Sequence, residues 1–218
     1  PFTGQGNFFD GFALKPNPDM LIEELGKRFE IMEASIKKWC VGSPIQSVLD
    51  ATQALIDEHG VRPDTAKRIV ITMPDDRMHI VNNGAMPDVC VQHLVAMSIV
   101  DGTVTFASVH DHDRMDDPAV QAVRKCVELV GSPELTVAKP ARQGIVEVEL
   151  KDGRKVRHHA VAVRGTPDNP MTTGEIETKA IDLVAPISGE AKAKGLVKAI
   201  ATLGSLRSVR ELRPLLQA

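Results

Sequence analysis

The sequence predicts an α+β fold followed by a helical C-terminal segment. Helix and strand patterns alternate up to about residue 161, only helical patterns follow Thr172, and no internal repeat divides the chain. The 218 residues are 43% hydrophobic and 25% charged, which is enough for one large or two small packed cores. This composition excludes disordered, collagen-like and disulfide-scaffold proteins.

Charge and cysteine content narrow the function classes. Lys and Arg number 26 against 29 Asp and Glu, so a net charge of -3 argues against nucleic acid as a partner. No stretch reaches the roughly 20 apolar residues of a membrane-spanning helix, so we expect no membrane partner. Cys40, Cys90 and Cys126 form no close pair, which indicates reduced thiols in a cytoplasmic protein rather than an iron–sulfur site. The expected partner is a small molecule or another protein chain.

The first elements are short. Residues 1–17 alternate phenylalanines with glycines, which is typical of an irregular segment that needs a body to lie on. A helix is expected over 18–25, closed by Gly26. Ser43 and Gln46 form a capping-box pattern that begins an amphipathic helix ending near residue 60.

The middle of the chain predicts a sheet and a buried helix. The β-branched run 68–72 predicts a strand, and 87–100 is apolar on nearly every side, which predicts a buried helix. Residues 145–161 predict a hairpin around Asp152–Gly153. We favour a three-residue loop, which would pair Leu150 with Val156, Glu149 with Arg157, and Glu147 with His159. A two-residue loop would instead place Val156 opposite Glu149.

The C-terminal segment begins with a second capping-box pattern, formed by Thr172 and Glu175. Pro186 and Gly189 are expected to interrupt the helices that follow.

Three stretches together resemble the C-terminal half of the MmgE/PrpD family. They are SIKKW at 35–39, MPDVCVQHLVA at 86–96 and RGTPDNPMT at 164–172. The last is the most specific, because such a string has little chance of arising from composition alone. Known members of the family include 2-methylcitrate dehydratase, cis-aconitate decarboxylase and iminodisuccinate epimerase.

The resemblance implies a large all-helical domain and a smaller α+β lid domain. On that map residues 1–17 connect from the helical domain, 18–163 form the lid, and 164–218 return to the helical domain. The N-terminal helical domain has no counterpart here, and the sequence starts at Pro1 without an initiating Met. We therefore expect the helical half to be on another chain or missing, and a homo-oligomer or heteromer to form.

The resemblance also implies chemistry that develops negative charge next to a carboxylate. We expect a lyase, first of all a hydro-lyase similar to 2-methylcitrate dehydratase, that acts on a small di- or tricarboxylate. The family's metal-independent members imply no cofactor and no metal. An epimerase or decarboxylase of the same family is one alternative. A non-catalytic subunit or fragment of a split enzyme is another, and a small-molecule sensor is a third.

Lys37 is the first candidate catalytic residue. It matches a lysine that faces the substrate in related enzymes, and it can hold a carboxylate or transfer a proton. The plain alternative is a solvated lysine. Gln46 stands where many members have a histidine, and we assign it to substrate binding. The family usually has Tyr–Pro where this chain has Trp39–Cys40, which indicates altered substrate choice or proton transfer.

His93 is the second catalytic candidate. It shares a helix face with Cys90 and Met97 and matches a position where many relatives carry a tyrosine that faces the active site. Its imidazole could replace that phenol, whereas a core histidine bonded to a backbone carbonyl is the alternative. Arg77 could bind a substrate carboxylate with its planar guanidinium, or pair with a neighbouring aspartate.

Two further stretches are expected to be structural. His110–Asp113 resembles a metal-ligand cluster, but its spacing does not suit one helix face, so we expect a polar connection that caps the next helix. The string 164–172 is expected to fix a chain crossover, with Asn169 bonding backbone groups.

Overall fold

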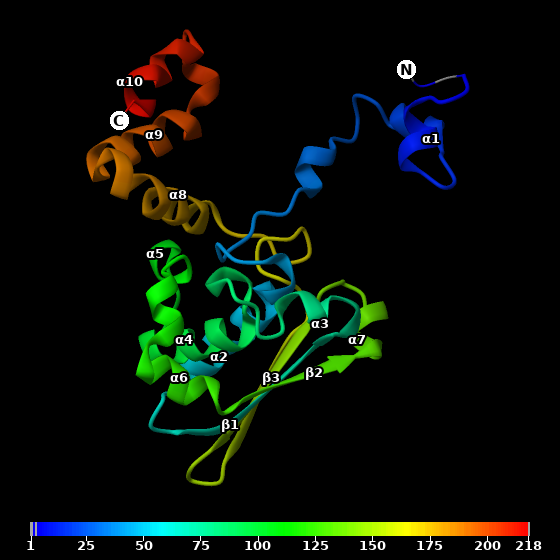
Figure 1. Cartoon of the computed structure of the whole chain (residues 1–218). Coiled ribbons are helices and arrows are strands. Elements are labelled where there is room, and N and C mark those ends of the chain that lie inside the picture. The colour runs from blue at the N-terminus through cyan, green and yellow to red at the C-terminus, as the bar shows by residue number, and fades with distance from the viewer. Residues whose placement is uncertain (1, 3, 218) are drawn as a thin grey trace. The chain divides into compact units, whose positions relative to one another are not determined.

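The structure, a computed structural model, describes residue 2 and residues 4–217. The chain divides into two compact units, residues 1–34 and residues 35–218. The boundaries expected after residues 17 and 163 stay predictions. The helices are α1 (Phe8–Phe12), α2 (Gln46–His59), α3 (Asp75–Val81), α4 (Val91–Asp101), α5 (Phe106–Val109), α6 (Pro118–Arg124), α7 (Pro133–Val137), α8 (Thr173–Ser188), α9 (Glu190–Ala201) and α10 (Arg213–Leu216). The strands are β1 (Ala66–Pro74), β2 (Val127–Ser132), β3 (Gly144–Leu150) and β4 (Lys155–Ala160) (Figure 1).

A mixed four-stranded sheet forms the base of the larger unit. Its strand order is β2-β1-β3-β4, with β1 and β2 parallel and the other pairs antiparallel. One face is apolar because Ile69 and Ile71 of β1 stand opposite Val148 and Val146 of β3. Helices α2 and α4 lie on this face of the sheet, and their buried side chains form one core with it (Figure 1). The α+β class and the strand expected at 68–72 are confirmed.

The hairpin register differs from the predicted one by two residues. The loop has the expected three residues, but it comprises residues 151–153 because the Leu150 amide donates to the Arg154 carbonyl at 2.8 Å. Val148 therefore pairs with Val156, and Glu147 pairs with Arg157 rather than with His159. A shift of two keeps every side chain on its expected face, so hydrophobic alternation alone could not separate the two registers.

α2 and α4 form the core against the sheet. The predicted capping box at Ser43 and Gln46 is wrong, since residues 43–45 form a 3₁₀ turn and the cap makes no side-chain hydrogen bond. The helix still ends at Gly60, which adopts the left-handed conformation with φ of 63°. The buried helix is confirmed, because every residue of α4 from Val91 to Ile99 is buried.

The smaller unit holds a phenylalanine cluster. Asn7 and Asp10 form a capping box around α1, and the Phe8 ring stacks on Phe12 with 4.7 Å between centroids. The helix expected over 18–25 is a 3₁₀ turn over Pro18–Leu21. None of the described residues between 2 and 34 is buried, so this apolar segment lacks a covering surface within its own unit.

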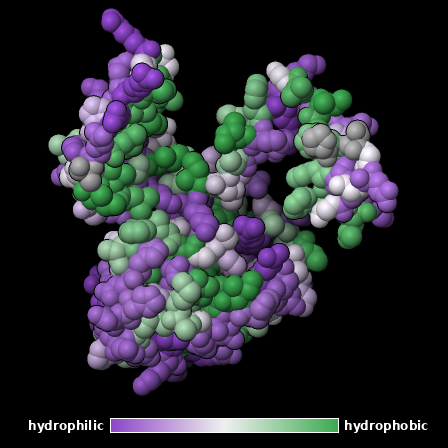
Figure 2. Space-filling model, turned by 45° about the horizontal axis from the view of Figure 1, so that its top comes forward, coloured by the Kyte–Doolittle hydropathy of each residue, from purple (hydrophilic) through white to green (hydrophobic). Residues whose placement is uncertain are grey.

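The C-terminal helices begin as predicted. Thr172 and Glu175 form the capping box of α8, Gly189 ends that helix, and Pro186 lies within its last turn. Apolar residues remain exposed along α8–α10, and Figure 2 shows this part with a continuous hydrophobic area beside a hydrophilic one. No helix in the described part of the chain is long and apolar enough to cross a membrane.

Candidate functional site

Lys37 and Gln46 meet at one backbone carbonyl. The Lys37 Nζ donates to the Val41 carbonyl at 3.1 Å, and the Gln46 Nε2 donates to the same oxygen at 3.3 Å. Gln46 is 3% exposed, and its amide also bonds both backbone groups of Trp39, at 3.1 Å to the nitrogen and 2.9 Å to the oxygen. The two side chains therefore brace the turn that leads into α2.

That turn, residues 42–44, forms one wall of a cavity of about 420 Å³, which we call the Arg77 cavity. The Gly42 amide donates to the Asp88 carbonyl at 2.9 Å and fixes the turn against the segment before α4. The volume lies within the range of small-molecule sites. The remaining lining comes from β1, α3 and the 136–142 region: Met73, Pro74, Asp76, Arg77, Ile80, Val81, Val89, Thr136, Ala141 and Arg142.

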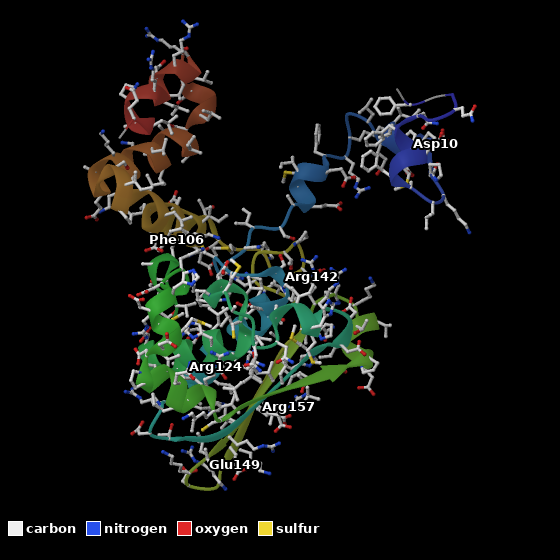
Figure 3. The ribbon with its side chains drawn as sticks, in the orientation of Figure 1. Asp10, Phe106, Arg124, Arg142, Glu149 and Arg157 are labelled. Atoms are coloured by element: carbon white, nitrogen blue, oxygen red, sulfur yellow. The ribbon has the colours of Figure 1, made fainter. Side chains whose placement is uncertain are left out.

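Two guanidinium groups and one carboxylate line this cavity. The Arg77 Nε lies 3.1 Å from the Asp76 Oδ2, and both side chains are exposed, so the pair is weak and can yield to a ligand. Arg142 makes no side-chain hydrogen bond or ion pair with any described residue and has a φ of 66°, an uncommon conformation for a residue with a side chain. Figure 3 labels it beside the α3 end of the sheet. The excess positive charge suits a carboxylate.

His93 lies apart from these groups. It is 0% exposed, and neither ring nitrogen has a hydrogen-bond partner among the described residues, so the bond to a backbone carbonyl that the alternative interpretation requires is absent there. Burial, followed by the positive charges of Arg124 and Arg114, lowers the pKa of His93 to about 4. The imidazole is therefore neutral near pH 7, and a buried polar ring without a partner costs stability.

The structure thus holds Lys37 and Gln46 together at the Val41 carbonyl and places Arg77 in the cavity lined by the 42–44 turn. Neither Lys37 nor Gln46 lines that cavity, and His93 lies in the core. Sequence reasoning missed Arg142. No motif marks it, because its place depends on a loop conformation that brings residue 142 into the same cavity lining as the 42–44 turn.

The polar stretch after α5 is confirmed as a connection. The Asp117 carboxylate accepts from the Ala119 amide at 2.8 Å and caps α6. Within the described residues, no group of three or more His, Cys, Asp or Glu side chains is placed to hold a metal ion.

The crossover string is also structural. Arg164 bonds Glu175 through Nε at 3.1 Å and Asn169 through Nη1 at 2.7 Å. The Asn169 Nδ2 in turn donates to the Ala162 carbonyl at 3.0 Å, as expected. The string ties the end of the sheet to the start of α8.

Comparison with protein families identifies the chain's larger part. The family model described as the MmgE/PrpD C-terminal domain matches residues 39–203, well over half of the 218 residues. Comparison with curated proteins found no match.

Proposed function

The chain belongs to the MmgE/PrpD family, which includes dehydratases and related enzymes, and we propose that it forms part of a lyase for small di- or tricarboxylates. The observation that carries the proposal is the Arg77 cavity, where two guanidinium groups meet a braced turn. The first reaction to test is loss of water, as in 2-methylcitrate dehydratase.

The proposed reaction starts with removal of a proton from the carbon next to a carboxylate. The electron pair left on that carbon delocalises into the carboxylate and then expels hydroxide from the neighbouring carbon as an acid protonates the leaving oxygen. The products are an unsaturated acid and water. Guanidinium groups held on the carboxylate stabilise the additional negative charge that develops in the first step.

Arg77 and Arg142 are proposed to hold substrate carboxylates, with Gln46 acting through the turn it braces. Lys37 is proposed to contribute an ammonium or a proton, since its Nζ bonds only the Val41 carbonyl among the described residues. His93 is proposed as the second proton-transfer group because its imidazole is neutral near pH 7. His93 is fully buried and lines neither cavity of this size in the described chain, so this role requires the core around its ring to open.

A partner chain is proposed to supply the other wall of the site. Ile187 and Val209 in the C-terminal segment are 77% and 71% exposed, and Leu14 and Phe12 in the smaller unit are 104% and 80% exposed. Apolar side chains left open to this extent favour association. A helical half would cover them.

The proposal is tested by following proton exchange in deuterated water by NMR, with citrate-like and succinate-like acids. Exchange at the carbon next to a carboxylate reports proton removal even when dehydration does not follow. Isothermal titration measures binding in parallel, so a chain that lacks a partner still gives a readout. We expect Arg77→Ala and Arg142→Ala each to weaken binding about tenfold, as loss of a charged hydrogen bond does.

Arg207→Ala is the matched control, because Arg207 is exposed and lies outside the Arg77 cavity. Equal binding in all three variants would overturn the proposal. Exchange with inversion and no loss of water would identify an epimerase, release of carbon dioxide a decarboxylase, and binding with no exchange a non-catalytic subunit or a sensor.

A further inference from the structure

A second cavity, of about 670 Å³, lies between the segment 38–40, α5 and the first half of α8. We call it the Trp39 cavity. It shares no lining residue with the Arg77 cavity. Its lining includes none of the four site residues predicted from the sequence, Lys37, Gln46, Arg77 and His93. Its volume lies within the range of small-molecule binding sites, so the cavity is large enough to bind a ligand of its own.

The inner lining of this cavity is apolar. Val109 is 1% exposed and Val104 is 8% exposed, so both belong to the core. Phe106 is 43% exposed, and Figure 3 labels it where α5 approaches α8. The other apolar side chains are Trp39, Cys40 and Met171. Flat aromatic and aliphatic surfaces of this kind suit a ring or a short acyl chain.

The lining holds two ammonium groups and two carboxylates, and Arg164, which lies outside the lining, neutralises one of the carboxylates, so one positive charge remains. Lys38 and Lys179 contribute two ammonium groups. Of the two carboxylates, Glu175 is already engaged by Arg164, at 2.5 Å between Oε2 and Nη2, whereas Asp182 remains as a single negative charge. A ligand with one negative charge balances this wall, and a di- or tricarboxylate would exceed it.

Lys38 is the group best placed to receive that charge. Its Nζ lies 4.4 Å from the centroid of the Trp39 ring, and no carboxylate in the described part of the chain pairs with it. Lys179 already donates to the Lys37 carbonyl. A ligand carboxylate could therefore pair with Lys38 while its apolar body covers Phe106 and Val109.

We propose that the Trp39 cavity binds a small monocarboxylate with an aromatic or acyl body, at a site separate from the Arg77 cavity. The proposal does not depend on the lyase reaction. It rests on the apolar lining, the balance of charge and the absence of a shared wall.

The chain carries its own reporter for this site. Trp39 is the single tryptophan and the chain has no tyrosine, so indole fluorescence arises from one residue that lines the cavity. Titrating the full chain with phenylacetate or hexanoate should give a saturable change in emission. Acetate lacks the large apolar group, and 2-phenylethanol lacks the negative charge. Each should bind at least tenfold more weakly than phenylacetate.

Two variants test the placement. Lys38→Gln removes the ammonium and should weaken phenylacetate binding at least fivefold, and Thr178→Phe should fill the cavity from α8 and abolish the response. Lys125→Gln, an exposed lysine outside the cavity, is the matched control. Arg77→Ala should leave phenylacetate binding unchanged, which separates failure of this site from failure of the lyase proposal.

No saturable response, or a response that Lys38→Gln and Thr178→Phe leave unchanged, would overturn the proposal. Citrate binding that displaces phenylacetate with equal affinity would overturn the assignment to a monocarboxylate.

Discussion

The backbone of Gly165 lies against the backbone of Ile36, and the Ile36 amide donates to the Gly165 carbonyl at 2.7 Å. Gly165 has a φ of 94°, and a Cβ placed on it would lie 1.8 Å from the Ile36 carbonyl oxygen. Only glycine permits this approach. The relationship explains why glycine follows Arg164 in the crossover string and how the chain just before Lys37 is held.

Gly165→Ala should destabilise the fold severely. The added methyl group meets a backbone atom that cannot move aside, and the left-handed conformation adds strain, so we expect a loss of at least about 3 kcal/mol. Urea unfolding of the full chain measures it. Gly174→Ala is the matched control, since a Cβ there meets nothing within 4 Å. A loss under about 1 kcal/mol for Gly165→Ala would contradict this account.

Gln46→Leu should loosen the turn beside the Arg77 cavity. The substitution removes the hydrogen bonds to Trp39 and to Val41. The backbone nitrogen and oxygen of Trp39 lose these partners, whereas the Val41 carbonyl keeps its bond from Lys37. We expect a loss of about 2 to 3 kcal/mol and a shift in the Trp39 emission. Ser47→Ala is a neighbouring control, because the buried Ser47 hydroxyl has no hydrogen-bond partner among residues 2 and 4–217 and its removal should cost almost nothing. Equal losses in the two variants would argue against the bracing role.

His93 should make the fold acid-sensitive. Its pKa is about 4 in the folded chain and near 6.5 when unfolded, so between these values the unfolded chain binds a proton that the folded chain does not. The free energy of unfolding therefore falls as pH falls from about 6.5 to 4, by about 3 kcal/mol in all, and the contribution is fully present above that window. Unfolding in urea at several pH values measures the loss.

His93→Leu should remove this pH dependence and, near pH 7, should stabilise the fold, since an unpartnered polar ring leaves the core. His79→Leu, an exposed histidine of α3, should leave the dependence in place. Parallel pH curves for the wild-type chain and His93→Leu would contradict the prediction.

Arg164→Met should raise the pKa of Glu175. The Arg164 guanidinium, followed by the amide and hydroxyl of Thr172, lowers the pKa of Glu175 to about 2. Without the guanidinium we expect that pKa to return toward its ordinary value by about one unit or more. NMR titration of the carboxyl carbon measures the change. Arg210→Met should leave it unchanged, and a pKa that stays near 2 in Arg164→Met would assign the effect to Thr172 alone.

Ile187→Glu should reduce association of the chain. Ile187 is 77% exposed on α8, whose apolar side chains are proposed to meet a partner. Native mass spectrometry or sedimentation should show oligomers for the wild-type chain and fewer for the variant. Val137→Glu, at a side chain that is also 77% exposed but lies on α7, is the control. A wild-type chain that stays monomeric at every concentration would remove the physical support for a partner.

Local patterns were enough to place the main elements. The β-branched run predicted β1, the absence of a polar side predicted α4, and Thr172 with Glu175 predicted the start of α8. Each of these signals lies within a few residues of the element it specifies, so tertiary contacts do not override it. The string 164–172 likewise indicated both the family and a structural crossover.

Hydrophobic alternation was not enough to predict the register of the β3–β4 hairpin, because a shift of two residues leaves the alternation unchanged. The hairpin register was predicted with Glu147 opposite His159, whereas Glu147 pairs with Arg157, because both registers keep the same side chains on the same face. The capping box predicted at Ser43 is wrong because of a tertiary contact. The Gln46 side chain, which would have completed the box, instead bonds the backbone of Trp39.

The sequence by itself determined the fold class, the family and the residues Lys37, Gln46, Arg77 and His93 as candidates. Only the tertiary structure decided that Lys37 and Gln46 meet at the Val41 carbonyl and that Arg142 joins Arg77 in one cavity. It also decided that His93 is enclosed with no hydrogen-bond partner among the described residues. Residues 77 and 142 are 65 positions apart, and no local signal encodes a meeting that depends on how α3 and the loop before β3 pack. Burial and charge at a site are properties of that packing.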